Sequence, residues 1–287
     1  MSQLKQIQEE GELVNTLKFI AQAFEEISVL RMRKVRESVV NSREFVKEIS
    51  TVFYDVKASY QEKIKHLIEK KQLAGAQPAA TSRLAILISA NSKLYGEVVN
   101  SVFEKFYSSS QDQDTDLLII GRLGKELYER QEKKKKYLYF EIPDAQVFVQ
   151  DIQTIMYHLI RYDDIDVYYA HFESILHQTP LVSNITGNEP FAVEGTTPRK
   201  EITKFFFEPD LEEILTVFKT QVFIALFKQT IHEAHLAHYA SRVTAMEQAL
   251  VHIERESQIL YSEQRKAKKQ EENKKVLERV AGRRLYS

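Results

Sequence analysis

The chain has 287 residues, of which 43% are hydrophobic, and a formal net charge of −1, which is enough length for about two domains. This charge balance argues against a general nucleic-acid binder, because phosphate backbones require a surplus of Lys and Arg. The lack of cysteine excludes disulfides, thiolate metal sites and cysteine nucleophiles. No apolar run approaches the roughly 20 residues that span a bilayer, and the start MSQLKQIQEEGE lacks a signal-peptide layout, so we expect a cytoplasmic protein.

The helix breakers predict three segments. All six prolines fall between Pro78 and Pro209, and six of the eight glycines fall between Gly75 and Gly195. Both ends of the chain are therefore free to form long helices, while the middle carries the turns. We expect an N-terminal shaft helix at 1–74, a central α/β domain at 75–208 and a C-terminal shaft helix at 209–287.

The first helix shows apolar residues at coiled-coil spacing. They follow alternating steps of four and three and predict a seam that needs a partner helix: Leu13, Leu17, Ile20, Phe24 and Ile27. After a basic interruption, a seven-residue repeat continues with Val39, Val46, Ile49, Phe53, Val56 and Tyr60.

The central segment alternates short apolar runs with helical patterns. Strands are predicted at 84–89, 116–121, 137–142, 165–174 and 180–186, and helices at 92–107, 124–136 and 144–160, with Asp144 as an N-cap. This order implies a mostly parallel, Rossmann-like sheet covered on both faces, whose last two strands form an antiparallel hairpin.

The last segment contains 72 residues, Asp210 to Ala281, without glycine or proline. Its seam positions are Leu236, Tyr239, Val243, Met246, Leu250, Ile253 and Leu260. The simplest partner for this helix is the N-terminal one, so the predicted fold class is α/β with a long antiparallel coiled coil of the two terminal helices plus the central domain. The alternative is two amphipathic helices lying flat on that domain. Beyond Leu260 the seam positions turn polar, which predicts a tip without a partner helix, or a frayed charged tail.

Candidate catalytic motifs are incomplete. HEAHLAH (232–238) spaces its histidines at i, i+3 and i+6, whereas a zinc protease needs i, i+4, so no metal is predicted. GRLGKE (121–126) follows a strand and opens a helix, where phosphate can bind, but it matches neither phosphate-loop fingerprint. We expect no cofactor and no catalytic residue. The least supported hypothesis for the function is an α/β enzyme that binds phosphate at Gly121 to Lys125.

Several motifs, in order along the chain, resemble the gamma subunit of F-type ATP synthases. FFFEPDLEEILTVF (205–218) and YASRVTAMEQAL (239–250) are similar to that family's Phe-Glu-Pro run and its Ala-Ala-Arg-Met-Thr-Ala-Met motif. Supporting matches are LKQI at the start, RMRKVRE (31–37), IGRLGKELY (120–128) and IDVYYAHFESILHQTPLV (165–182). The resemblance covers nearly the whole chain.

The resemblance implies a non-catalytic rotor shaft that couples ion translocation to ATP synthesis or hydrolysis. Its implied partners are three alpha and three beta subunits around the shaft, the epsilon subunit and the membrane c-ring, with membrane contact only through the rotor and no homo-oligomer. The implied location is peripheral, on the cytoplasmic face of the inner membrane.

The resemblance also suggests contact residues. The basic run Arg31, Arg33, Lys34 and Arg36 is expected to meet acidic loops of the catalytic ring, although a solvated basic face is the plainer reading. Further contacts are expected at Arg242 on the shaft and at the tip arginines Arg279, Arg283 and Arg284. Arg242 has a plain reading as a surface arginine beside the seam, and Met246 is expected in the core.

Two motifs depart from the family pattern. SANSKLYGEVVN (89–100) replaces the usual Gly-Leu-Cys-Gly-Gly region, and the terminal signature survives in altered form as NKKVLERVAGRRL (273–285). The alternative function is therefore a gamma-derived coiled-coil scaffold or linkage subunit of a specialised ATPase-like motor.

Overall fold

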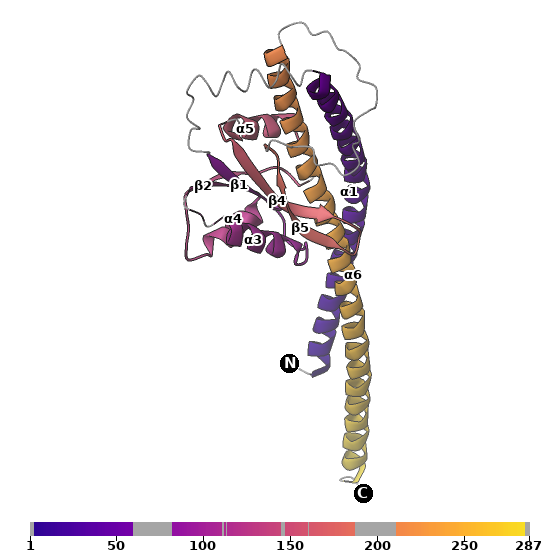
Figure 1. Ribbon diagram of the computed structural model, residues 1–287. Coiled ribbons are helices and arrows are strands. Elements are labelled where there is room, and N and C mark those ends of the chain that lie inside the picture. Colours follow the sequence, from indigo (N-terminus) through magenta and orange to yellow (C-terminus); the bar gives the residue numbers. More distant parts are fainter. Residues whose placement is uncertain are drawn as a thin grey trace. The chain divides into compact units, whose positions relative to one another are not determined.

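The computed structural model describes residues 3–59, 82–110, 112, 114–144, 147–159, 161–186 and 211–284, with the backbone alone at 53–59, 149, 211–219 and 281–284. Its elements in chain order are α1 (Gln3–Ser59), β1 (Arg83–Ile88), α3 (Val98–Ser109), β2 (Thr115–Ile120), α4 (Arg122–Glu129), β3 (Tyr137–Phe140), α5 (Val149–Leu159), β4 (Asp164–Phe172), β5 (Gln178–Asn184) and α6 (Leu211–Arg284). The two terminal helices, the five predicted strands and the predicted fold class are all present (Figure 1).

Contacts divide the chain into two compact units. The smaller unit contains Met1–Val29 and Arg242–Ser287, and the larger unit contains Leu30–Ser241. Both long helices contribute to both units, because α1 and α6 each run unbroken through a boundary. The helix α6 has 74 residues, which corresponds to roughly 110 Å at the usual rise per residue.

The larger unit is built on a five-stranded sheet of order β3-β2-β1-β4-β5. The first four strands are parallel, and β5 pairs antiparallel with β4, as the predicted hairpin requires. The order of β1, β2, β3 and β4 is that of a dinucleotide-binding fold, in which the chain changes direction between β1 and β4. The Rossmann-like prediction is confirmed.

Helices cover both faces of this sheet, α3 and α4 on one side and α5 on the other (Figure 1). Strand β1 shows how the alternation works. Ala85 and Leu87 join a core with α3, whereas Leu84, Ile86 and Ile88 join the opposite core with α5. Helix α6 contributes to both cores, which explains why every side chain from Glu233 to Ser241 is buried. This stretch also buries polar side chains, among them Glu233, His235 and His238.

In the smaller unit, the two terminal helices pack antiparallel. Lys18 pairs with Glu254 at 2.6 Å, and the guanidinium carbon of Arg242 lies 5.8 Å from the ring centroid of Phe24. Residues later in α1 therefore contact residues earlier in α6, as an antiparallel pair requires. From Lys268 to Val280 every side chain of α6 is exposed.

The N-terminal seam is shifted from the predicted one. Leu17 is 46% exposed, and Leu13, Ile20 and Ile27 are also exposed, so the prediction is wrong for these residues. The buried positions are Ile7, Ala21 and Ser28, and the same seven-residue step reaches Val35 in the larger unit. Small residues allow close approach of a helix, and Ser28 satisfies its hydroxyl by donating to the Phe24 carbonyl at 2.6 Å. Of the predicted seam, Phe24 is half-buried.

Other element predictions need smaller corrections. Helix α4 ends at Glu129, so the lysines at 133–136 do not extend it. Helix α3 begins at Val98 and α5 at Val149, later than predicted in both cases. Residues 60–81 and 187–210 lie outside the described residues, and with them Tyr60 and the Phe207, Glu208 and Pro209 run.

Candidate functional site

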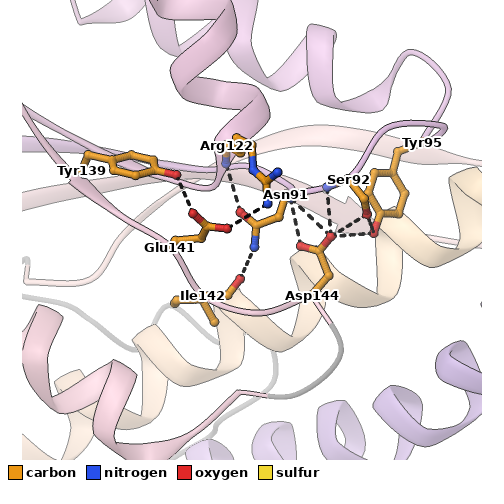
Figure 2. Close-up of polar contacts among 8 residues, drawn as sticks. All are labelled: Asn91, Ser92, Tyr95, Arg122, Tyr139, Glu141, Ile142 and Asp144. Carbon is orange, nitrogen blue, oxygen red and sulfur yellow. Dashed lines mark hydrogen bonds and ion pairs between the residues drawn. The ribbon is translucent and has the colours of Figure 1, made fainter.

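The carboxyl ends of β1, β2 and β3 meet at one edge of the sheet, where folds of this topology bind ligands. Here the edge is occupied by the chain's own polar side chains (Figure 2). Asn91 follows β1 and joins all three strand ends. Its side-chain amide donates to the Ile142 carbonyl at 2.5 Å, and its Oδ1 accepts from the Arg122 backbone N–H at 3.0 Å.

Asp144 holds the loop between β1 and α3 in place. Its carboxylate accepts from the backbone N–H groups of Asn91 at 3.0 Å and Ser92 at 3.2 Å, and from the hydroxyls of Ser92 at 2.8 Å and Tyr95 at 3.1 Å (Figure 2). The predicted N-cap role is wrong, because α5 begins only at Val149 and Asp144 is engaged by another loop. The competing partners were residues about fifty positions away in sequence, which local spacing could not reveal.

The protonation of Asp144 follows from these contacts. Burial opposes its ionisation, but hydrogen bonds from Asn91 and Ser92, helped by the charges of His238 and His235, hold the pKa of the carboxyl below its usual range. A depressed carboxyl pKa contributes stability that is present above the unfolded-state pKa and lost as the pH falls through the folded-state value. This loop is therefore fully held at neutral pH.

Replacing Asp144 by Ala is expected to release the loop between β1 and α3. We expect a loss of about 2 kcal/mol in unfolding free energy, because buried donors lose a charged acceptor. Amide hydrogen exchange at Asn91 and Ser92 should accelerate at least tenfold, the equivalent of about 1.4 kcal/mol of local opening. Because the pKa of Asp144 is lowered, the same acceleration in the wild type should develop only as the pH falls below the ordinary carboxyl range. Ser92→Ala, which removes one hydroxyl bond, is the milder control; equal exchange in both variants would contradict the role assigned to Asp144.

Helix α6 anchors to this same edge of the sheet. The Tyr239 hydroxyl donates to the Asp144 carbonyl oxygen, and the Ser241 hydroxyl donates to the Tyr95 carbonyl at 2.6 Å. The rings of Tyr95 and His238 lie 5.3 Å apart between centroids. Side chains of α6 thus occupy the position that a dinucleotide takes in related topologies.

The glycines of GRLGKE are explained by packing. A Cβ at Gly121, whose φ is +99°, would lie 2.7 Å from the Ser89 carbonyl, and one at Gly124 would lie 2.8 Å from the Ser89 Cβ. The first amides of α4 already have acceptors, since Arg122 donates to Asn91 Oδ1 and Leu123 donates to the Ala90 carbonyl at 2.9 Å. The structure therefore gives no support to a phosphate site at Gly121 to Lys125.

A charged cluster around the buried Glu233 joins α1, α6 and β4 at a second place in the larger unit. Glu233 is 4% exposed; its Oε1 accepts from Arg43 Nε at 2.8 Å and from Gln229 Nε2 at 3.1 Å, while His171 Nδ1 lies 2.9 Å from Oε2. Burial opposes its ionisation, but the bonds from His171 and Arg43 lower the pKa of Glu233 to about 2. Sequence reasoning missed this cluster; a glutamate between apolar positions of α6 was its only signal.

The predicted basic run separates into two kinds of residue. Arg33, Lys34 and Arg36 are exposed on α1, as a contact surface requires. Arg31 is half-buried, and its guanidinium carbon lies 6.0 Å from the Tyr239 ring centroid. Cation–π attraction and packing of its stem give Arg31 a structural role within the larger unit.

The remaining predicted contact residues lie in the smaller unit. Arg242 is 3% exposed and lies over Phe24, so the expectation of an exposed contact there is wrong. An arginine can be buried in a seam because its planar cation stacks on an aromatic face. Arg279 is exposed near the end of α6, while the side chains of Arg283 and Arg284 are not described. Val243 and Leu250 are half-buried and Met246 is buried, on the side of α6 that faces the seam.

The three histidines of HEAHLAH do not converge. His232 and His235 line a cavity between α1 and α6, whereas His238 packs against Tyr95. Within the described ranges no group of three or more His, Cys, Asp or Glu side chains is placed to hold a metal ion. Nor does any helix in the described part of the chain have an apolar stretch long enough to cross a membrane.

Two long helices that pair antiparallel in the smaller unit, with a Rossmann-like sheet between them in sequence, define the architecture of this chain. A family model described as ATP synthase matches residues 3–283. The chain belongs to this family, and the relatives that it matches are ATP synthase gamma chains.

Individual relatives are distant. The gamma chain of Staphylococcus epidermidis is 23% identical over 257 residues, covering 87% of both chains, and that of Staphylococcus aureus is 23% identical over 304 residues, covering 98% of both. Among solved structures, a chain of the Tetrahymena thermophila mitochondrial ATP synthase central stalk and c-ring matches with a TM-score of 0.58 and 20% identity, over 80% of this chain and 99% of that one. A chain of the Euglena gracilis enzyme matches at 0.57 and 14% identity, over 88% and 93%. These likenesses agree with the fold described above.

Proposed function

We propose that this chain turns as the rotor shaft of an F-type ATP synthase or ATPase, inside a ring of three catalytic and three non-catalytic nucleotide-binding subunits. In this proposal it performs no bond-making step itself. It couples ion flow through a membrane c-ring to ATP synthesis or hydrolysis, together with an epsilon subunit. The complex would sit on the cytoplasmic face of the membrane, with this chain as a peripheral part.

The observation that carries the proposal is the unbroken α6, which contributes both to the two-helix unit and to the sheet unit. A shaft must be stiff, and two helices packed on each other bend less than one. It must also turn without locking, which suits the polar surface of the end of α6, where ion pairs such as Lys275 with Glu271 at 3.0 Å stay within the helix.

Contact with the ring is proposed at exposed basic positions. Arg33, Lys34 and Arg36 on α1 would meet acidic loops of the catalytic subunits, and Arg279 would meet the sleeve around the tip. Long-range attraction between such surfaces steers encounter and weakens with ionic strength. The apolar residues Leu17, Ile20 and Ile27, exposed on the free chain, would face the same ring.

Native purification through a tag on this chain, placed away from the tip of α6, tests the proposal. Native mass spectrometry should count one copy per three copies of each of two nucleotide-binding subunits. Leaving this chain out of reconstituted membranes should abolish coupled ATPase activity. A complex without a nucleotide-binding ring would contradict the proposal and favour the alternative, a gamma-derived scaffold in another motor, which the departure at 89–100 also suggests.

A further inference from the structure

A cavity of about 600 Å³ lies between α1 and α6 in the larger unit. Polar and basic side chains share its lining with an apolar wall. The polar part includes Lys34, Lys228, His232 and His235, and the apolar part includes Val35, Phe45 and Ile224. Its volume falls in the range of small-molecule sites.

The charges in this cavity are of one sign. Neither Lys34 nor Lys228 forms an ion pair with another described residue, and no carboxylate is among the described residues that line the cavity. His235 is buried and His232 is half-buried. A partly enclosed cavity with two unpaired ammonium groups is electrostatically favourable for an anion.

The titration of His232 agrees with this reading. Burial, and then the charges of His235 and Lys228, lower the pKa of His232 to about 4. Burial also lowers the pKa of His235, whereas the negative charge of Asp144 acts to raise it. These groups disfavour protonation of His232, and an anion beside them would offset that effect.

We propose that this cavity binds a small phosphomonoester, with the phosphoryl group beside Lys228 and His232 and the apolar part against Phe45 and Ile224. Two lysines favour a dianion over a single carboxylate, and the apolar wall leaves room for more than inorganic phosphate. Exposed Phe45 offers an aromatic face to a ring. The inference does not depend on the rotor function, since it concerns a site on this chain alone.

Calorimetric titration of the full chain with three probes tests the site. Phenyl phosphate should bind at least tenfold more tightly than inorganic phosphate, and phenol should not bind. Lys228→Gln should weaken phenyl phosphate about tenfold or more, because a charged hydrogen bond is lost. The matched control is Lys266→Gln, an exposed lysine on the same helix outside the cavity lining, which should leave the affinity unchanged.

Proton linkage supplies an independent readout. The pKa of His232 is about 4 without ligand, and a bound anion should raise it. Binding should therefore be accompanied by proton uptake at pH values below 7. The wild type should therefore gain affinity over His232→Gln between pH 7.5 and 6. Equal binding by the Lys228→Gln and Lys266→Gln variants, no binding of phenyl phosphate, or equal binding of phenol would each overturn the proposal. Binding of inorganic phosphate as tight as phenyl phosphate would overturn the phosphomonoester assignment.

Discussion

Replacing Glu233 by Gln is expected to lower the unfolding free energy of the chain at pH 7 by about 1–2 kcal/mol, the scale of a charged hydrogen bond, because Arg43 and His171 stay partly solvated when their partner is lost. The substitution keeps the size of the side chain but removes the negative charge that Arg43 and His171 face. Because the cluster joins α1, α6 and β4, the loss should appear as faster hydrogen exchange in all three elements. Chemical unfolding followed by far-ultraviolet circular dichroism measures the effect.

Acid should produce the same loss in the wild type. The folded pKa of Glu233 is lowered from 4.5 to about 2, so its contribution is complete above about pH 4.5 and disappears as the pH falls through 2. The Glu233→Gln variant should lack this part of the pH dependence. The control is Glu247→Gln, because Glu247 is exposed on the same helix; its stability should change by less than about 0.5 kcal/mol. Equal unfolding of the two variants would show that the cluster contributes nothing net.

Replacing Met246 by Asp should separate the paired helices of the smaller unit. Met246 is 6% exposed in the seam, and burying an unpaired carboxylate there costs at least about 3 kcal/mol. In the assembled complex we expect ATP hydrolysis to continue while ATP-driven membrane potential falls several-fold, because a shaft with separated helices transmits little torque. An oxonol dye on membrane vesicles reports that potential for either coupling ion.

The matched variant is Val251→Asp, on the same helix at a position that is 67% exposed. In the free chain it should change stability by less than about 0.5 kcal/mol, whereas Met246→Asp should shift the unfolding midpoint clearly. If Met246→Asp leaves both stability and coupling intact, the seam does not stiffen the shaft.

The sequence predicted the architecture because its signals were strong and local. Glycine and proline gathered in the middle of the chain, and short apolar runs such as LLII in β2 marked buried strands. The C-terminal seam followed from bulky residues at regular spacing, including Met246 and Leu260, which are both buried.

The N-terminal seam was missed because its buried positions are small. Ala21 and Ser28 are buried where helices approach closely, while the larger Leu17 and Ile20 are exposed. A count of bulky apolar residues therefore selects the wrong face. The site contacts were missed for a different reason. Asp144 and Glu233 find their partners on elements distant in sequence, and spacing along one helix or loop carries no record of them.

The anchoring of α6 at the sheet edge has a mechanical consequence. Apolar packing is non-directional. Two surfaces held together by it alone therefore resist separation better than they resist sliding. The bonds from Tyr239 to the Asp144 carbonyl and from Ser241 to the Tyr95 carbonyl are directional, and each is lost when the helix slips or rolls by a fraction of a turn. The two bonds therefore hold α6 at one position on the sheet edge. Other sheets of this topology bind a nucleotide in this crevice, whereas here the crevice prevents a helix from slipping under torsional load.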